Sequence, residues 1–261
     1  MTIGYVHASG LDDINQYLGH VKASIDYAIG PMVGCKVLDV GCGPASDTLR
    51  LSPLVGASGY VIGVDSDSEM VDEANSRLAG CKNFINVEHI VDNVSSLRFS
   101  DNCFDIVRCE RVLQHIDNPS TAIREMHRVL RPGGRLVIAD TDHASLCIDT
   151  DFIETERAFC LFRTRQFANG LAGRKLYRWF VQAGLNDVKV GACSSVTTSL
   201  EVAIKKRLFL NEVDKLAVKQ GAVSATDMAN FLANLRDRHE AGQFCMSSQI
   251  FIVSGNKNEI E

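Results

Sequence analysis

The nine residues from Val37 to Ala45 constrain this chain more than any other stretch. They begin with a short apolar run, which is typical of a strand buried on both faces in a parallel sheet. The run breaks at Gly41 and Gly43, where glycine permits a tight turn and a close backbone approach to a ligand. A helix is then expected to begin near Ser46 and Asp47, which are suited to cap its N-terminus. Strand, glycine turn and helix start together predict a cradle for a nucleotide-like ligand.

Further apolar runs alternate with helical patterns in the rest of the chain. Four of them, at 60–64, 86–91, 104–108 and 135–139, are expected to be strands, the last ending at Asp140. This rhythm predicts an α/β fold with a doubly wound, Rossmann-like sheet. Later residues add helices at 151–167 and 174–183, a strand at 188–196, a helical block at 200–239 and a strand at 244–253. The expected sheet therefore has seven strands, mostly parallel, with an antiparallel last strand and helical insertions forming a lid.

Three regions are expected along the chain. Apolar spacing in 11–29 indicates a helix, so residues 1–30 are interpreted as an N-terminal helical cap. Residues 31–142 form the nucleotide-binding core. Residues 143–261 complete the sheet, and their insertions at about 143–172 and 197–241 are assigned to a substrate lid.

The composition excludes several classes of protein. A net charge of −5 argues against a dedicated nucleic-acid binder, which normally carries a basic field. No apolar run approaches the length of a membrane span, and the first residues lack a secretory pattern. The nine cysteines form no Cys-x-x-Cys pair, so neither a zinc site nor a disulfide framework is expected. Free buried thiols favour a reducing, cytoplasmic setting.

The glycine turn alone leaves two ligands open. A dinucleotide fingerprint has a third glycine, where this chain has Ser46. Asp65 ends the second strand about twenty residues further on, where an acidic side chain can bind ribose hydroxyls. This much fits either NAD or an adenosyl ligand.

The complete set of motifs distinguishes between these ligands. In order along the chain they are 37–43 (VLDVGCG), Asp65 with Met70, 104–107 (FDIV), 113–115 (LQH) and 128–134 (RVLRPGG). This set, covering about residues 35–142, resembles the class I S-adenosylmethionine-dependent methyltransferases. The resemblance is closest to the branch that acts on small molecules such as quinones, sterols, phosphobases and natural products. It implies S-adenosylmethionine as cofactor and no metal.

The resemblance also implies roles for single residues in the cradle. Gly41 and Gly43 would let the backbone lie against the methionine part of the cofactor. Asp39 would order the turn and the ammonium end of the cofactor. Asp65 would accept hydrogen bonds from both ribose hydroxyls.

Further cofactor contacts are implied around the adenine and at the end of the fourth strand. Ser66 and Met70 would flank the adenine. Counting back from Leu97 places Asn93 on the adenine amino group, whereas a one-residue bulge would place Asp92 there, and both alternatives stay open. The remaining implied contacts come from Val94 and, through backbone atoms, from Arg108 and Cys109.

Catalytic candidates are expected where the methyl acceptor would lie, outside the carboxyl ends of strands four and five. His115 is the first choice, as a base or as a group that orients the acceptor, because its ordinary pKa is close to neutral. Its alternative role is to brace the loop after strand four. Tyr17 and His143 are further candidates.

The predicted function is methyl transfer to an oxygen, nitrogen or carbon nucleophile of a small-molecule metabolite. One alternative is an RNA or protein methyltransferase, which the acidic balance and the sequence 108–111 (RCER) disfavour. Another is a non-catalytic partner subunit, against which the intact Gly41, Gly43 and Asp65 argue. The expected partner is a small-molecule acceptor and no nucleic acid. No motif identifies the acceptor, the methylated atom or the oligomeric state.

Overall fold

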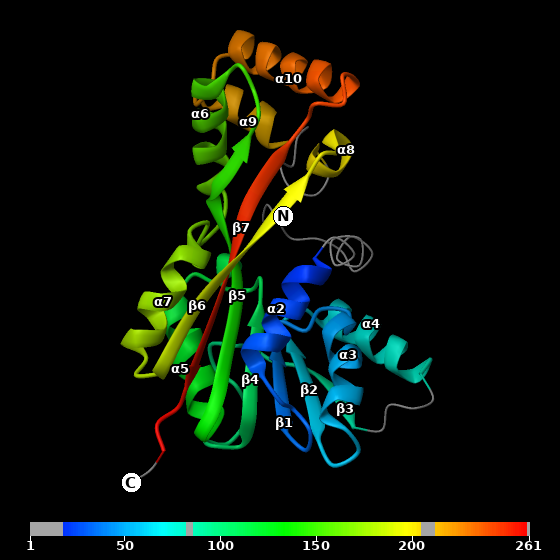
Figure 1. Cartoon of the computed structure of the whole chain (residues 1–261). Coiled ribbons are helices and arrows are strands. Elements are labelled where there is room, and N and C mark those ends of the chain that lie inside the picture. The colour runs from blue at the N-terminus through cyan, green and yellow to red at the C-terminus, as the bar shows by residue number, and fades with distance from the viewer. Residues whose placement is uncertain (1–17, 82–85, 205–211, 260–261) are drawn as a thin grey trace.

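A seven-stranded sheet forms the centre of the molecule, with the strand order β3-β2-β1-β4-β5-β7-β6 (Figure 1). The structure is a computed structural model and describes residues 18–81, 86–204 and 212–259. β1 to β5 run parallel, and β7 is antiparallel to both of its neighbours, β5 and β6. This confirms the expected sheet. The strands are β1 (Lys36–Val40), β2 (Tyr60–Asp65), β3 (Val87–Val91), β4 (Phe104–Glu110), β5 (Leu130–Ile148), β6 (Asn186–Thr197) and β7 (Met246–Asn256).

Helices cover both faces of this sheet. On one face α5 (Pro119–Val129) and α7 (Ala172–Gln182) pack on a core that includes Leu38 and Val40. On the other face α2 (Gly19–Ile29) and α3 (Ser46–Val55) pack on a core that includes Val37. β1 is therefore apolar on both sides, as a central parallel strand must be. The remaining helices are α4 (Ser68–Ala79), α6 (Ile153–Thr164), α8 (Leu200–Ala203), α9 (Val213–Lys219), α10 (Ala225–Glu240) and the 3-10 turn η1 (Leu113–His115).

β5 continues past its expected end at Asp140 and stops only at Ile148. The segment 143–148, expected to begin the lid, is therefore strand. The reason is its antiparallel partner: β7 pairs with β5 along its whole length, from Asn256 opposite Arg135 to Met246 opposite Ile148. This pairing supplies backbone hydrogen bonds where the sequence is too polar to predict a buried strand.

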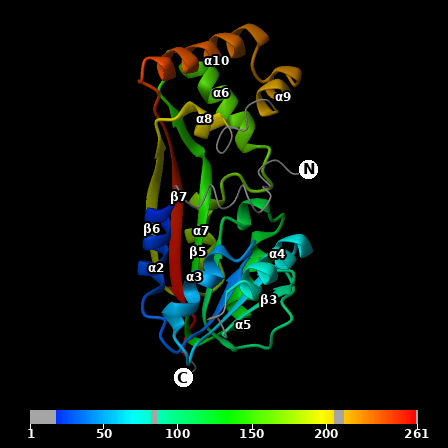
Figure 2. The same ribbon diagram turned by 90° about the vertical axis from the view of Figure 1, so that its right-hand side faces the viewer.

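The extended parts of β5, β7 and β6 carry a second lobe (Figures 1 and 2). Helices α6, α8, α9 and α10 lie on this three-stranded arm and enclose a separate hydrophobic core. Phe159 of α6 and Phe231 of α10 meet in that core with their ring centroids 6.2 Å apart. The second lobe therefore has its own packing and does not depend on helices of the nucleotide-binding core.

Other expected features can be compared within the described residues. α2 occupies 19–29 of the expected N-terminal helix, and residues 11–17 lie outside the described part. No described helix is both long enough and apolar enough to cross a membrane. All nine cysteines have free thiols, and no three potential metal ligands cluster among the described residues.

A substitution at Gly63 tests how tightly β2 packs against α3. A methyl group at Gly63 would lie 2.8 Å from Thr48 Cγ2 and 2.9 Å from Cys42 Sγ. We expect Gly63→Ala to lower the free energy of unfolding by about 1–3 kcal/mol, because the overpacked contact forces the helix away from the sheet. Gly191→Ala is the control, since its nearest contact would be 3.9 Å away. Urea denaturation that gave equal midpoints for the two variants would contradict this packing.

Candidate active site

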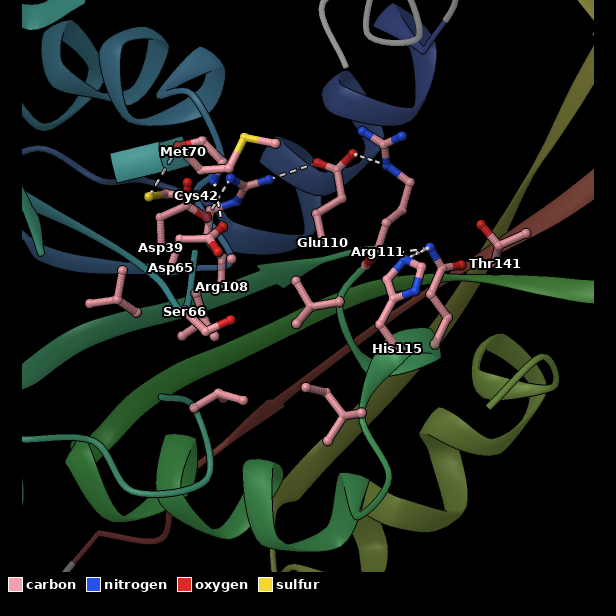
Figure 3. A pocket seen from close by; sticks show the side chains of 18 of the residues that line it. Asp39, Cys42, Asp65, Ser66, Met70, Arg108, Glu110, Arg111, His115 and Thr141 are labelled. Atoms are coloured by element: carbon pink, nitrogen blue, oxygen red, sulfur yellow. Dashed lines mark hydrogen bonds and ion pairs between the residues drawn. The ribbon is translucent and has the colours of Figure 1, made fainter. Parts of the chain in front are cut away.

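A pocket of about 640 Å³ opens outside the carboxyl ends of the parallel strands (Figure 3). This volume lies within the range of roughly 300–1,000 Å³ that holds small ligands and cofactors. The turn after β1 and the ends of β2, β3 and β4 line one part of the pocket. Residues of η1, β5, α6 and β7 line the other part: Gln114, His115, Thr141, His143, Leu146, Arg163 and Ser248, with Phe167 just after α6.

The turn after β1 forms the expected cradle. Gly41 has a φ of +73°, and a Cβ there would lie 2.1 Å from Val112 Cγ2, so only glycine fits. Gly43 also has a positive φ, of +52°. α3 begins at Ser46 as expected, but its N-cap is Ala45, with no side-chain cap. The prediction of Ser46 or Asp47 as N-cap was wrong, because the turn leaves Ala45 with a φ of +71° and Asp47 pairs with cations instead.

Asp65 is fixed at the end of β2 by two backbone donors. Its Oδ2 accepts a hydrogen bond from Gly43 N at 3.0 Å, and its Oδ1 accepts one from Asp67 N at 3.0 Å. Burial raises the pKa of Asp65. A carboxylate held in this way, with Ser66 and Met70 also lining the pocket, can bind a pair of neighbouring hydroxyl groups.

The loop after β3 brings both Asp92 and Asn93 to the pocket, together with Val94. Asp92 accepts hydrogen bonds from Asn93 N and Arg98 N, at 2.9 and 3.0 Å. Asn93 Oδ1 accepts one from Ser95 N at 2.8 Å. The structure therefore places both of the open alternatives in the pocket.

The side chain of Arg108 lies at the centre of a buried network of charges. Only 1% of this side chain is exposed, and it forms ion pairs with Asp39 (2.8 Å), Glu110 (2.8 Å) and Asp47 (3.3 Å). Lys22 of α2 joins the network through Asp47 and through Glu110, the latter at 2.7 Å. We refer to these five residues as the Arg108 network. It ties α2, β1, α3 and β4 together directly beneath the cradle.

Burial and nearby cations act against each other within the Arg108 network. Burial alone would raise the pKa of Asp47 and Glu110, but the neighbouring cations outweigh it and hold both values below the usual range. At Asp39 burial prevails and raises the pKa to about 7. Two buried atoms of the network, Asp39 Oδ2 and Arg108 Nε, have no hydrogen-bond partner among the described residues, although both side chains line the pocket.

At the other end of the pocket the structure brings two of the predicted catalytic residues together. Gln114 lies between them: its Oε1 is 2.8 Å from His143 Nε2, and its Nε2 is 2.9 Å from His115 Nε2. The His143 ring stacks on Phe167, with centroids 3.7 Å apart and planes at 14°. The third candidate, Tyr17, lies outside the described residues.

A bulge in β5 explains why His143 reaches the pocket. The pairing of β5 with β7 shifts register between Asp142 and Cys147. Ser145 stabilises the bulge, since its Oγ donates to Asp142 O at 2.6 Å and accepts from Gln249 N at 2.8 Å. The extra residues of the bulge include His143 and Leu146, both of which line the pocket. Bulges often redirect side chains next to active sites in this way.

Arg108 and Cys109 were expected to meet the cofactor through backbone atoms. Arg108 lines the pocket and its side chain also organises the cradle, whereas Cys109 is not among the lining residues. Sequence reasoning also missed Lys22, Arg163 and Phe167. Arg108, in the middle of a strand expected to be buried, was the signal that could have pointed to the ion-pair network, because a buried charge requires partners.

Comparison with known proteins identifies the family to which this chain belongs. The family model of a methyltransferase domain matches residues 32–184, more than half of the chain. An uncharacterised protein of a Streptomyces fradiae transposon is 36% identical over 87% of this chain, and the match spans 64% of that longer protein. The demethylmenaquinone methyltransferase of Staphylococcus haemolyticus is 28% identical over 67% of this chain and 78% of its own length. Phosphoethanolamine N-methyltransferase 2 of Haemonchus contortus, solved with S-adenosylmethionine, has a TM-score of 0.58 at 20% identity, over 94% of this chain and 53% of that one.

This chain belongs to the methyltransferase-domain family. Within it, the glycine cradle and the seven-stranded sheet are those of a class I S-adenosylmethionine-dependent methyltransferase, so the resemblance seen in the sequence is confirmed.

The described residues fit S-adenosylmethionine. Gly41 and Gly43 have no side chains and line the pocket, so the backbone itself can contact a ligand there. The unpartnered Oδ2 of Asp39 is a suitable acceptor for an ammonium group. The two ends of the pocket leave space for a cofactor beside a second small molecule.

We expect Asp65→Ala to weaken S-adenosylmethionine binding at least tenfold, because it removes a carboxylate that two backbone amides hold in place. Isothermal titration calorimetry measures this directly. Asp72→Ala, an exposed position on α4, is the control and should bind as the unchanged protein does. Equal affinity of the two variants would remove Asp65 from the cofactor site.

The stability of the protein should depend on the protonation of Asp140. This side chain is fully buried and accepts hydrogen bonds from Gln114 N and Thr141 N, and burial raises its pKa to about 7. Because the folded state then holds a proton that the unfolded state releases near pH 4, the contribution of Asp140 to the free energy of unfolding should fall as pH rises from about 4.5 to 7.

Asp140→Asn cannot ionise, so the free energy of unfolding of the unchanged protein should fall relative to that of the variant over this range. Asp39, whose pKa is raised, and His89, His115 and His127, whose pKa values are lowered, contribute to the slopes of both proteins alike. Urea denaturation at pH 4.5, 6 and 7.5 checks this. An identical slope in the unchanged protein and the variant would show that Asp140 is ionised throughout.

Proposed function

We propose that this protein transfers the methyl group of S-adenosylmethionine to an oxygen, nitrogen or carbon nucleophile of a small-molecule metabolite. The observation that carries this proposal is the continuity of the pocket. From the cradle it extends to a compartment bounded by His143, Leu146, Arg163 and Phe167, all contributed by residues beyond the nucleotide-binding core. A total of about 640 Å³ suits a cofactor with one small acceptor.

In this proposal the cradle binds the cofactor through Gly41 and Gly43, with Asp39 at the ammonium group and Asp65 on the ribose hydroxyls. These roles are supported by the position of both glycines in the wall of the pocket and by the fixed carboxylate of Asp65. Around the adenine we place Ser66, Met70, Asp92, Asn93 and Val94, which all line the pocket.

We assign the second lobe to the lid. Residues 31–142 form the cofactor core, residues 1–30 a cap, and the insertions between 143 and 261 enclose the acceptor. Arg163 on α6 supports this division, because it lines the pocket although its helix packs in the separate core of the second lobe. The free cysteines are consistent with a reducing compartment, so we propose that the protein works in the cytoplasm.

In this proposal the residues of the chain contribute mainly by aligning the acceptor with the methyl group. The sulfonium of S-adenosylmethionine supplies an already activated methyl group. The residues of the pocket then hold the acceptor in line with that group and exclude water. In this proposal His115 and His143 contact the acceptor, which is supported by their place in the wall of the pocket.

Two other functions are less well supported. An RNA or protein acceptor would need an open and preferably basic surface, whereas the chain carries a net charge of −5 and the candidate residues His115 and His143 lie inside the pocket. A non-catalytic partner subunit would not need the glycine cradle and the fixed Asp65 that this chain retains.

A transfer assay with methyl-labelled S-adenosylmethionine tests the proposal. Acceptors should include demethylmenaquinone and phosphoethanolamine, which appear in the names of a relative and of a structural neighbour. Bulk RNA and a protein extract should be tested beside them. We expect label in a small-molecule product and its loss in Asp65→Ala. Label found in RNA or protein, or no transfer despite cofactor binding, would contradict the proposed function.

A further inference from the structure

The amide of Gln114 decides how the two histidines of the pocket are protonated. Its Oε1 faces His143 Nε2 at 2.8 Å, and its Nε2 faces His115 Nε2 at 2.9 Å. An amide oxygen can only accept a hydrogen bond and an amide nitrogen can only donate one. The protonation of each imidazole therefore follows from the orientation of this one amide.

The backbone fixes that orientation. Gln114 Nε2 also lies 3.2 Å from the carbonyl oxygen of Arg111, to which it donates. Turning the amide over would place its oxygen against this carbonyl, so that two acceptors would face each other without a proton between them. The backbone of Gln114 is itself held by Asp140, whose Oδ2 accepts from Gln114 N at 3.1 Å.

The tautomers follow directly. His143 must carry a proton on Nε2, because it donates to an amide oxygen. His115 must accept at Nε2, because the Gln114 amide donates to it. An imidazole that accepts at Nε2 is neutral and carries its proton on Nδ1. Burial and the nearby Arg111 lower the pKa of His115, which agrees with a neutral ring.

The proton of His115 is thus on its other ring nitrogen, Nδ1. The atom is shielded from solvent and has no hydrogen-bond partner among the described residues, while the ring lines the acceptor part of the pocket (Figure 3). A buried donor that lacks an acceptor destabilises the structure unless a ligand supplies one.

We propose that His115 acts in methyl transfer as a hydrogen-bond donor through Nδ1, with Gln114 as the residue that positions it, and that the acceptor presents a negatively charged oxygen, as a phenolate or an enolate does. This inference rests on the proposed function and deepens it. It replaces the expectation of His115 as a base, because the nitrogen a base would use is already occupied by Gln114.

Methyl transfer to such an acceptor needs no base from the protein. The acceptor loses its proton to solvent before it binds, which acidic phenols and the enols of 1,3-dicarbonyl compounds do near neutral pH and which simple alcohols do not. The electron pair of the anion forms the new bond to the methyl carbon, and the pair of the broken carbon–sulfur bond stays on sulfur. The anion and the sulfonium thereby become two neutral groups, while the donor from His115 holds the acceptor oxygen in place.

Nuclear magnetic resonance of the imidazole nitrogens tests the tautomer without any acceptor. The full chain, labelled with 15N-histidine and saturated with S-adenosylhomocysteine, should show a protonated Nδ1 and an unprotonated Nε2 at His115. Loss of these signals in His115→Asn assigns them. In Gln114→Glu the carboxylate accepts from His115, so the proton should appear on Nε2. A protonated Nε2 at His115 in the unchanged protein would overturn the proposal whatever the variants do.

Transfer rates test the role of the donor with the first acceptor identified by the labelled-methyl assay. Asparagine places an amide donor near the position of Nδ1, glutamine places one near Nε2, and alanine places none. We expect His115→Ala and His115→Gln to lower kcat about 10- to 100-fold, the loss expected for a hydrogen bond to a charged group, and His115→Asn to recover most of it.

Calorimetry with S-adenosylmethionine should give the same affinity for all three variants, which separates this role from cofactor binding. His115→Asn as slow as His115→Ala would contradict the donor role, as would a preferred acceptor that is a simple alcohol or an ammonium. Failure of the unchanged protein to methylate any small molecule would refute the proposed function instead, and the tautomer measurement would stand independently of it.

Discussion

The rest of this structure depends on the ion pairs of Arg108. Three carboxylates, Asp39, Asp47 and Glu110, converge beneath the glycine turn, and in a buried site they would repel one another strongly. A single guanidinium, assisted by Lys22, compensates them. Removing one partner of such a set leaves an uncompensated buried charge, which typically costs about 3–5 kcal/mol. The position of the cradle relative to α2, α3 and β4 is thus determined largely by electrostatics.

This arrangement also links the structural and chemical roles of the site. Arg108 occupies one oxygen of Asp39 and leaves the other without a partner, so the same carboxylate can anchor the turn and remain available to a ligand. At the far end of the pocket Asp140 and Gln114 work similarly, because the carboxyl holds the backbone of η1 while the amide orients two histidines. In both places a buried polar group determines the geometry of the group that meets the ligand.

The sequence predicted the elements whose signals are local. β1, the glycine turn and Asp65 lie within short stretches where apolar runs, glycines and a strand-end acid have direct structural meaning. It did not predict the Arg108 network, since the carboxylates that pair with Arg108 lie up to 69 residues from it and share no periodic pattern. It also ended β5 too early, because Asp142 and Ser145 are polar and their pairing with β7 is a tertiary interaction. His115 lines the pocket, but its protonation depends on the orientation of the Gln114 amide, which the sequence does not reveal.

The separate core of the second lobe has a consequence for how such a chain can diversify. Mutations among α6, α8, α9 and α10 are accommodated by a core that shares no buried residue with those flanking the cradle. Selection can therefore alter the helices of the second lobe while the glycine cradle keeps its stability. The bulge of β5 limits this freedom, since it brings His143 and Leu146 from the base of the second lobe into the wall of the pocket.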